Sequence, residues 1–253
     1  MKRVTLTPLL WLAVGSASCS AASTPEDGSP GAGSVVAPPK NPLGRARCQA
    51  PAGTSAAPRD SQEAVALLNA LPKPTSVACF VESLARPLAI QATNSIFSAQ
   101  PALSDASPRV FIKLAQGWIS MVVDGDGSYL LEFGDIMADD PSRSIKGELQ
   151  LPLEAPVAPS APYDRVMFND TVTTCGFCHY DERRADSLPF PTAFASIAFR
   201  PRADSLVGVD SLRTQYQSCD WQTQPYRCDL LSAIFGGGEV VELPFSPSLP
   251  TFF

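Results

Sequence analysis

The apolar residues of this chain come in short runs that are separated by proline, glycine and other turn residues. Runs such as 109–114 and 144–151 alternate between apolar and polar residues, and this period of two is typical of β-strands. The 25 prolines favour a loop-rich fold over long helices. We therefore predict a mainly β (α+β) domain, an antiparallel sheet or sandwich with a few short helices. The strand–helix alternation of a parallel sheet is absent.

The clearest local element is a β-hairpin, with strands at 117–123 and 128–133 joined by the turn 124–127, Asp-Gly-Asp-Gly. Asp-Gly between β-rich runs favours a tight turn because glycine tolerates positive φ. A helix is expected over 60–71, where Asp60 and Glu63 have the spacing of a capping box. The remaining expected strands are 87–93, 109–114, 144–151, 165–168, 193–199 and 239–243, and the remaining expected helices are 204–215 and 228–235.

The first residues are typical of an exported protein. Residues 1–18 have a basic start, an apolar stretch of eleven residues at 4–14 and then small residues, a pattern that resembles a secretory signal peptide. The small residues before Cys19 resemble the bacterial lipobox, which implies that Cys19 is lipidated and becomes the mature N-terminus. The resemblance implies an outer-membrane lipoprotein of the cell envelope, facing the periplasm or the cell surface. Cleavage without lipidation, which gives a soluble periplasmic protein, is the alternative.

Composition divides the rest of the chain. Residues 19–58 are mostly Ala, Ser, Gly and Pro, which bury too little apolar surface to fold, so we expect a flexible tether there. Residues 59–253 are expected to form a single globular domain. The net charge of −6 argues against a nucleic-acid partner, because phosphate contacts need clustered Lys and Arg. Beyond the first fifteen residues, no apolar run approaches the ~20 residues of a membrane span.

Residues 175–179 read Cys-Gly-Phe-Cys-His and contain the single histidine of the chain. Cys-x-x-Cys-His is the attachment motif of c-type haem, and on about ten residues the chain resembles the c-type cytochromes. The resemblance implies a covalent haem c, with thioether bonds from Cys175 and Cys178 and with His179 as a ligand of the iron. Residues 180–185 are good helix formers, so we expect the motif at the start of a helix.

The second axial ligand of the iron departs from the common pattern. Small cytochromes c use a methionine that follows the motif, but no methionine follows His179. The available methionines are Met121, Met137 and Met167, all upstream. A lysine or another weak ligand, or a five-coordinate iron, are the alternatives. A five-coordinate iron would bind a small gas or peroxide instead of only passing electrons.

Three other interpretations of Cys175 and Cys178 stay open. The two residues could form a redox-active pair as in the thioredoxin family. They could bind zinc together with His179, Cys219 and Cys228. They could also form a plain structural disulfide.

The cysteine count agrees with haem attachment. The chain has seven cysteines, and four remain once Cys19 and the two motif cysteines are set aside. In an oxidising compartment, four cysteines predict two disulfides. We favour Cys48–Cys79, which ties the end of the tether to the domain, and Cys219–Cys228, which closes a small loop.

We therefore expect an exported mono-haem c-type cytochrome-like protein that transfers electrons, or senses a small ligand or redox state, at the cell envelope. Its expected partners are the haem, a membrane through the lipid anchor and an unidentified redox protein. The alternative is a disulfide-stapled surface lipoprotein that acts as a binding or envelope module without haem. A haem peroxidase is a third hypothesis, for which no distal acid or base is evident in the sequence.

Overall fold

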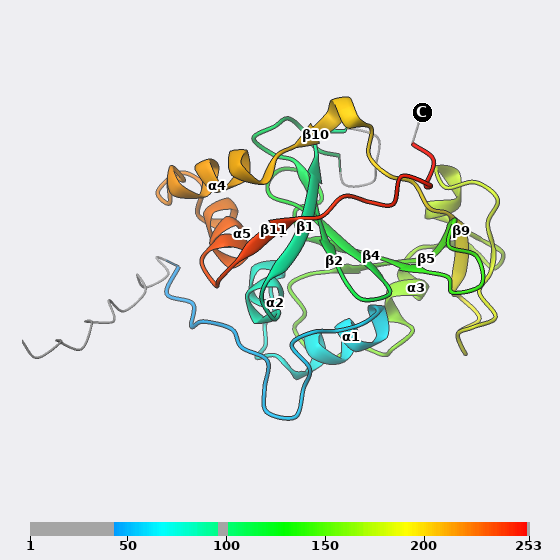
Figure 1. The fold of residues 1–253 in the computed structure, drawn as a ribbon. Coiled ribbons are helices and arrows are strands. Elements are labelled where there is room, and N and C mark those ends of the chain that lie inside the picture. Colours follow the sequence, from blue (N-terminus) through cyan, green and yellow to red (C-terminus); the bar gives the residue numbers. More distant parts are fainter. Residues whose placement is uncertain (1–42, 96–100, 252–253) are drawn as a thin grey trace, which may run out of the picture. The chain divides into compact units, whose positions relative to one another are not determined.

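A nine-stranded sheet is the frame of the fold (Figure 1). The computed structural model describes residues 43–95 and 101–251, and the elements below belong to the unit Lys40–Phe253. The strand order is β10-β1-β2-β3-β4-β5-β9-β8, with β11 also paired to β1. The strands of this sheet are β1 (Leu88–Thr93), β2 (Arg109–Lys113), β3 (Gly117–Val122), β4 (Leu130–Ile136), β5 (Arg143–Gln150), β8 (Arg183–Arg184), β9 (Phe194–Ile197), β10 (Leu206–Val207) and β11 (Val240–Glu242).

Neighbouring strands of the sheet run antiparallel, except that β11 runs parallel to β1. A separate small sheet pairs β6 (Met167–Asn169) with β7 (Val172–Thr173). The predicted mainly β fold with an antiparallel sheet and a few short helices is therefore confirmed.

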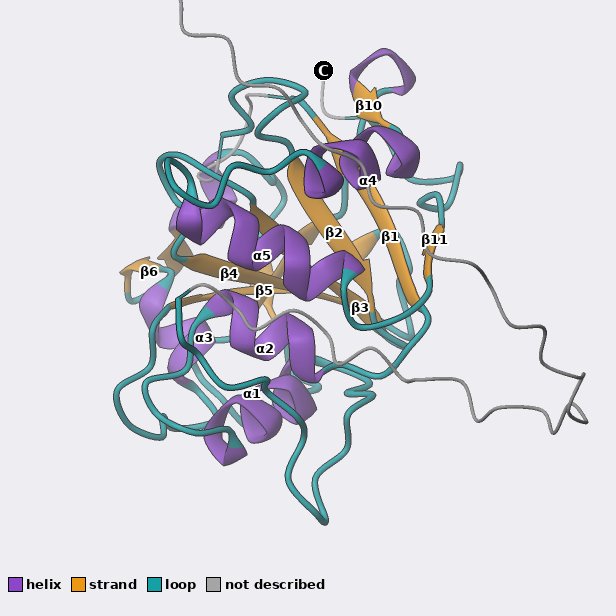
Figure 2. Cartoon of the chain, turned by 90° about the vertical axis from the view of Figure 1, so that its left-hand side faces the viewer, coloured by secondary structure: helices purple, strands orange, loops and turns teal. Residues whose placement is uncertain are grey.

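Helices cover one face of the sheet (Figure 2). They are α1 (Ser61–Ala70), α2 (Val77–Ser83), α3 (Ala161–Arg165), α4 (Val209–Gln217) and α5 (Pro225–Phe235). Leu67 of α1, Phe80 of α2 and Leu231 of α5 are fully buried in one cluster with side chains of β1 to β4, such as Ile90 and Ile119. Each such side chain contributes about 1.5–3 kcal/mol by leaving water, so this layer forms the main core.

The capped helix and the hairpin form as the sequence predicts. Asp60 is the N-cap of α1, and its carboxylate accepts a hydrogen bond from the Glu63 backbone N–H at 2.9 Å. Strands β3 and β4 pair from Gly117↔Asp135 to Ser120↔Glu132. In the turn between them, Gly125 has φ +84°, which glycine adopts without a Cβ clash.

The two disulfides are those that the sequence favours, Cys48–Cys79 and Cys219–Cys228. The described part of the expected tether, 43–58, contains no helix or strand. Cys48 is nevertheless buried in the main core, and the Arg45 guanidinium pairs with Glu82 and Asp229. The expected signal peptide, Cys19 and residues 19–42 of the tether lie outside the described residues.

The helix expected over 180–185 is wrong. The motif begins a single turn of 3-10 helix, η1 (Thr174–Phe177), and the chain then reverses. Asp181 has φ +60°, and the Arg143 guanidinium binds both its carbonyl and its carboxylate. Residues Arg183–Arg184 then join the sheet as β8. These tertiary contacts override the helix propensity of the segment.

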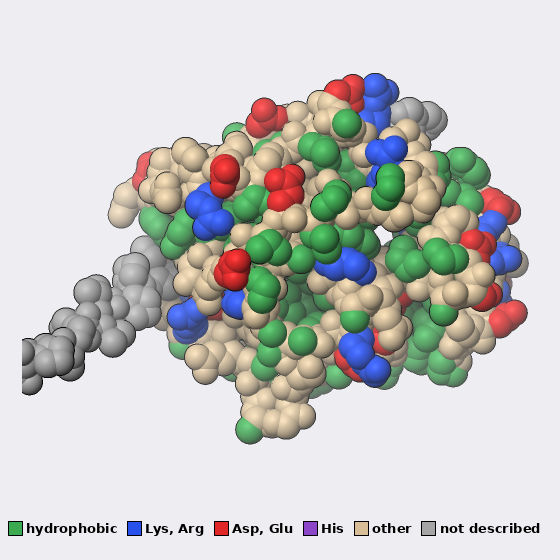
Figure 3. Space-filling model, in the orientation of Figure 1, with side chains coloured by type: hydrophobic (Ala, Val, Ile, Leu, Met, Phe, Trp, Pro, Cys, Tyr) green, Lys and Arg blue, Asp and Glu red, His purple; other side chains and the backbone are tan. Residues whose placement is uncertain are grey.

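On the face drawn in Figure 3, basic and acidic side chains are interspersed. Several of the exposed charges of the chain pair locally, as in Arg59–Glu63 and Arg202–Asp204. In the described part of the chain, none of the helices has the length and apolar character that crossing a membrane requires.

Candidate cofactor site

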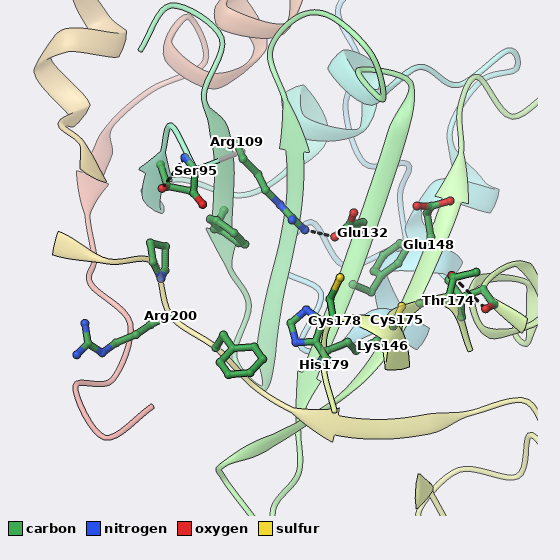
Figure 4. A pocket seen from close by; sticks show the side chains of 17 residues that line it. Ser95, Arg109, Glu132, Lys146, Glu148, Thr174, Cys175, Cys178, His179 and Arg200 are labelled. Carbon is green, nitrogen blue, oxygen red and sulfur yellow. Dashed lines mark hydrogen bonds and ion pairs between the residues drawn. The ribbon is translucent and has the colours of Figure 1, made fainter. Parts of the chain in front are cut away.

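The sheet face opposite the helices carries several polar and charged side chains. Side chains on alternate positions of a strand share a face, and the register places Phe111, Ser120, Glu132 and Glu148 opposite one another across four strands. Segments 174–179 and 199–201 border a pocket of about 190 Å³ over this face (Figure 4). The residues that line it are Thr93, Ser95, Arg109, Phe111, Glu132, Phe133, Lys146, Gly147, Glu148, Val166, Thr174, Cys175, Cys178, His179, Phe199, Arg200 and Pro201.

The motif is held in one turn by local hydrogen bonds. Thr173 is the N-cap of η1, and its hydroxyl accepts hydrogen bonds from the backbone N–H groups of Cys175 and Gly176 at 3.1 and 3.3 Å. The backbone N–H groups of Cys178 and His179 both donate to the Cys175 carbonyl, at 3.2 and 2.8 Å. The Glu182 carboxylate in turn accepts from the Thr173 backbone N–H and hydroxyl at 2.8 and 2.5 Å. The turn is therefore fixed before any ligand binds.

Both motif cysteines are free thiols. Cys175 is partly buried and Cys178 is exposed, while the other four cysteines of the described residues form disulfides. Burial raises the pKa of the Cys175 thiol, which the nearby Lys146 partly opposes, so Cys175 is protonated at neutral pH.

These thiols bear on the three alternative interpretations. A disulfide between Cys175 and Cys178 is not formed in this structure. Cys219 and Cys228 are bonded to each other, so they do not complete a zinc site with the motif. The largely antiparallel sheet also lacks the strand and helix order of the thioredoxin family. In the described ranges, no three His, Cys, Asp or Glu side chains are grouped as a bare metal ion requires.

The His179 ring is oriented by the backbone of β9. Its Nδ1 lies 2.9 Å from the Ile197 carbonyl, and its ring packs against Phe199 with 5.2 Å between centroids. A carbonyl oxygen only accepts, so Nδ1 carries the proton and Nε2 carries the lone pair. Burial lowers the pKa of His179 to about 3, with Lys146 as a second cause. A neutral imidazole whose other nitrogen donates to a carbonyl is the usual form of a metal-binding histidine.

Side chains of β2, β4 and β5 form the floor of the pocket. They include Arg109, Glu132 and Glu148, which form ion pairs, and Lys146, whose pKa is lowered. The Arg109 guanidinium binds the Glu132 carboxylate and the Ser120 hydroxyl. The Glu148 carboxylate accepts a hydrogen bond from Arg165 Nε at 2.9 Å. Burial lowers the pKa of Lys146 to about 7 and that of Arg109 to about 10.

These charged floor residues are not among the site residues that the motif predicts. A signal for them was present, because Arg109, Glu132 and the pair Lys146 and Glu148, two positions apart, lie in the expected strands 109–114, 128–133 and 144–151. On neighbouring antiparallel strands, such positions can share one face.

The three methionines do not reach this pocket. Met121 is fully buried in the main core, on the sheet face that the helices cover. Met137 is buried in a second cluster with Ile145 and Tyr163. Met167 lies in β6 and borders a different pocket. The structure therefore brings Cys175, Cys178 and His179 together but places no methionine with them.

The donor set of this pocket fits a c-type haem. Two thiols and a neutral imidazole come from one turn and border one pocket that has aromatic walls at Phe111 and Phe199. The volume of about 190 Å³ is below the roughly 300–1,000 Å³ of most ligand sites, so the pocket encloses only part of a group of that size. Phe177 and Phe168 are 64% and 63% exposed beside the motif, with ring centroids 5.0 Å apart, and they offer apolar contact there.

No family model, no curated protein and no solved structure matches this chain.

Proposed function

We propose that the protein is an exported mono-haem c-type protein that transfers electrons at the cell envelope. One observation carries the proposal: Cys175 and Cys178 are free thiols on the same turn as a neutral His179, and all three border one pocket. The other four cysteines of the described residues are paired, so the motif thiols stand apart from the structural cysteines.

The motif residues have the chemistry that attachment needs. The Sγ–H bond of each cysteine would add across one vinyl C=C bond of the haem, which would give one thioether per cysteine and consume no oxidant. His179 Nε2 would donate its lone pair to the iron, while the Ile197 carbonyl holds the ring through Nδ1. Phe199 packs against the imidazole and limits the access of water. The bound haem would supply a one-electron redox couple.

Electron transfer is favoured by the open side of the site. Cys178 is exposed, as is Phe177 of the motif, and the exposed ring of Phe168 packs against Phe177. A haem bonded to the exposed Cys178 would be within reach of a redox protein. The proposed lipid at Cys19 would keep this site at the membrane surface of the envelope.

The test is a pyridine haemochrome measurement on protein produced with a c-type maturation system. We compare the unmodified chain with a Cys175→Ala, Cys178→Ala double variant. A Cys219→Ala, Cys228→Ala variant is the matched control, because it removes the same number of cysteines from a different part of the fold. We expect one covalent haem per chain in the unmodified protein and in the control, and none in the motif variant.

The absence of covalent haem would contradict the proposal. If the unmodified chain carries no covalent haem while a co-produced c-type cytochrome matures, the proposal is wrong. Counting thiols then tests the second candidate, a disulfide-stapled surface module without haem. That candidate predicts two free thiols, Cys175 and Cys178, as the free cysteines of the structure indicate.

A further inference from the structure

Lys146 lines the same pocket as the motif, but the attachment motif gives this side chain no role. It lies in β5 and is 9% exposed. Its Nζ donates to the Ser144 hydroxyl at 2.6 Å and makes longer contacts with the Ser144 and Ser196 carbonyls, at 3.4 and 3.5 Å. Within 43–95 and 101–251, no carboxylate lies within ion-pair distance of this amine. A buried ammonium without a counter-charge is costly, so this position favours the neutral amine, whose nitrogen has a lone pair.

The other polar side chains of the pocket floor already have strong partners. Arg109 pairs with Glu132, and Glu148 pairs with Arg165. Arg109 also keeps its proton in proteins and has no lone pair to donate. Lys146 is therefore the floor residue whose nitrogen can serve as a donor to a metal.

Lys146 and His179 face shared space. Both line the main pocket, and both line an adjoining cavity of about 90 Å³. Figure 4 shows the two labelled side chains in the same group with Cys175 and Cys178. On β4 the residue opposite Lys146 is Gly134, which has no side chain to separate the amine from the pocket.

We infer that Lys146 Nζ would serve, together with His179, as a ligand of the haem iron. The inference rests on the proposed function. None of the three methionines reaches this pocket, and Lys146 would take the ligand position that a methionine holds in small cytochromes c. The coordination bond uses the nitrogen lone pair, and the ammonium proton leaves to solvent, so no oxidant or reductant is consumed. The competing role, an ion pair between the lysine and an anionic group of the haem, is separated by the test below.

The experiment measures the spin state of the ferric holoprotein by electron paramagnetic resonance and absorption spectroscopy. The unmodified protein is compared with the Lys146→Arg and Lys146→Met variants. Arginine keeps the positive charge but cannot bind iron, whereas methionine has a similar length and supplies a thioether ligand. The control is Lys113→Arg, a lysine of β2 that lines neither cavity.

We expect a low-spin signal in the unmodified protein and in Lys113→Arg, its loss to a high-spin signal in Lys146→Arg, and its return with altered g-values in Lys146→Met. A low-spin Lys146→Arg protein would overturn the inference and favour the ion pair. A high-spin unmodified protein would overturn it too. Pyridine haemochrome is recorded on every sample, so that absence of covalent haem is scored against the proposed function and not against this ligand.

A second measurement avoids substitutions altogether. The chain is produced with ¹⁵N-labelled lysine, and electron–nuclear double resonance is recorded on the ferric holoprotein. A hyperfine coupling from labelled nitrogen, of the size of a directly bound donor, identifies a lysine ligand even if a variant fails to load haem. Among the lysines of the described residues, Lys146 is the one that lines this pocket. Its absence from a low-spin protein would assign the sixth position to another residue.

Discussion

Among single residues, Asp135 shows most clearly how burial sets protonation in this protein. Its carboxylate is 9% exposed on β4 and accepts hydrogen bonds from the backbone N–H of Ser61, at 3.0 and 3.1 Å, and from the Ser61 hydroxyl. The same hydroxyl lies 2.6 Å from the hydroxyl of the fully buried Tyr163. Burial raises the pKa of Asp135 to about 6 despite the Ser61 hydrogen bonds, which lower it.

We predict that this carboxyl makes the protein less stable as the pH rises. A folded pKa above the unfolded one means that the folded state binds the proton more tightly. The stabilisation is full below about pH 4 and disappears as the pH rises through about 6. Between pH 5 and 8, the unfolding free energy of the unmodified protein should fall by about 1–2 kcal/mol relative to Asp135→Asn. Urea unfolding at both pH values measures this difference.

Comparison with the variant is needed because other buried groups act in the opposite direction. The lowered pKa of His179 makes the folded protein more stable as the pH rises toward neutrality. These groups are present in both proteins and cancel in the difference. A difference that stays constant, or that grows with pH, would contradict the assignment to Asp135.

At the scale of elements, the two disulfides should contribute unequally to stability. Cys48–Cys79 spans a sequence separation of 31 residues and Cys219–Cys228 one of nine. On the chain-entropy model a longer closed loop restricts the unfolded chain more. We expect Cys48→Ala, Cys79→Ala to lower the unfolding free energy by about 3–4 kcal/mol.

The Cys219→Ala, Cys228→Ala variant should lose about 2–3 kcal/mol. Calorimetry on the two variants and the unmodified protein gives the ranking directly. The reverse order would show that native-state packing, and not loop length, decides these contributions.

The elements that were predictable are those fixed by neighbouring residues. Asp60 caps α1 and Gly125 turns the β3–β4 hairpin, and both depend on interactions within a few positions. Strands β2 and β5 follow their alternation. Helix α2 was not predicted, although Ser76 caps it through the Cys79 N–H.

The candidate site was only partly predictable for a related reason. The spacing of Cys175, Cys178 and His179 is local and was evident in the sequence. The direction of the chain after the motif is set by Arg143, which holds Asp181 from a strand 38 positions earlier. The partnership of Lys146 with the motif depends on the same long-range packing. Local propensity depends on neighbouring residues and does not predict contacts between distant ones.

At the scale of the whole molecule, the sheet separates two regions. The main core lies between the sheet and the helices, and the motif borders the opposite, polar face. The motif residues are absent from the main core cluster. The domain can therefore hold its main core without depending on what occupies the pocket.

The expected lipid anchor is also a property of the whole chain, and we predict that Cys19 carries it. Replacing Cys19 with alanine should move the protein from the membrane fraction to the soluble fraction, because the acyl chains supply the membrane affinity. Mass spectrometry of the mature N-terminus should show the acylated cysteine in the unmodified protein only. A soluble, unmodified N-terminus in the original chain would favour ordinary signal cleavage instead.

The Cys48–Cys79 bond also decides how a mechanical load would travel through the molecule. A force applied to the chain before residue 48 crosses the disulfide directly into α2, whose side chains are packed in the main core. Residues 49–78, including α1, lie inside the covalent loop and carry none of that tension while the disulfide is intact. Pulling from the N-terminal side would thus load the main core directly, and the intervening loop could not be peeled off first.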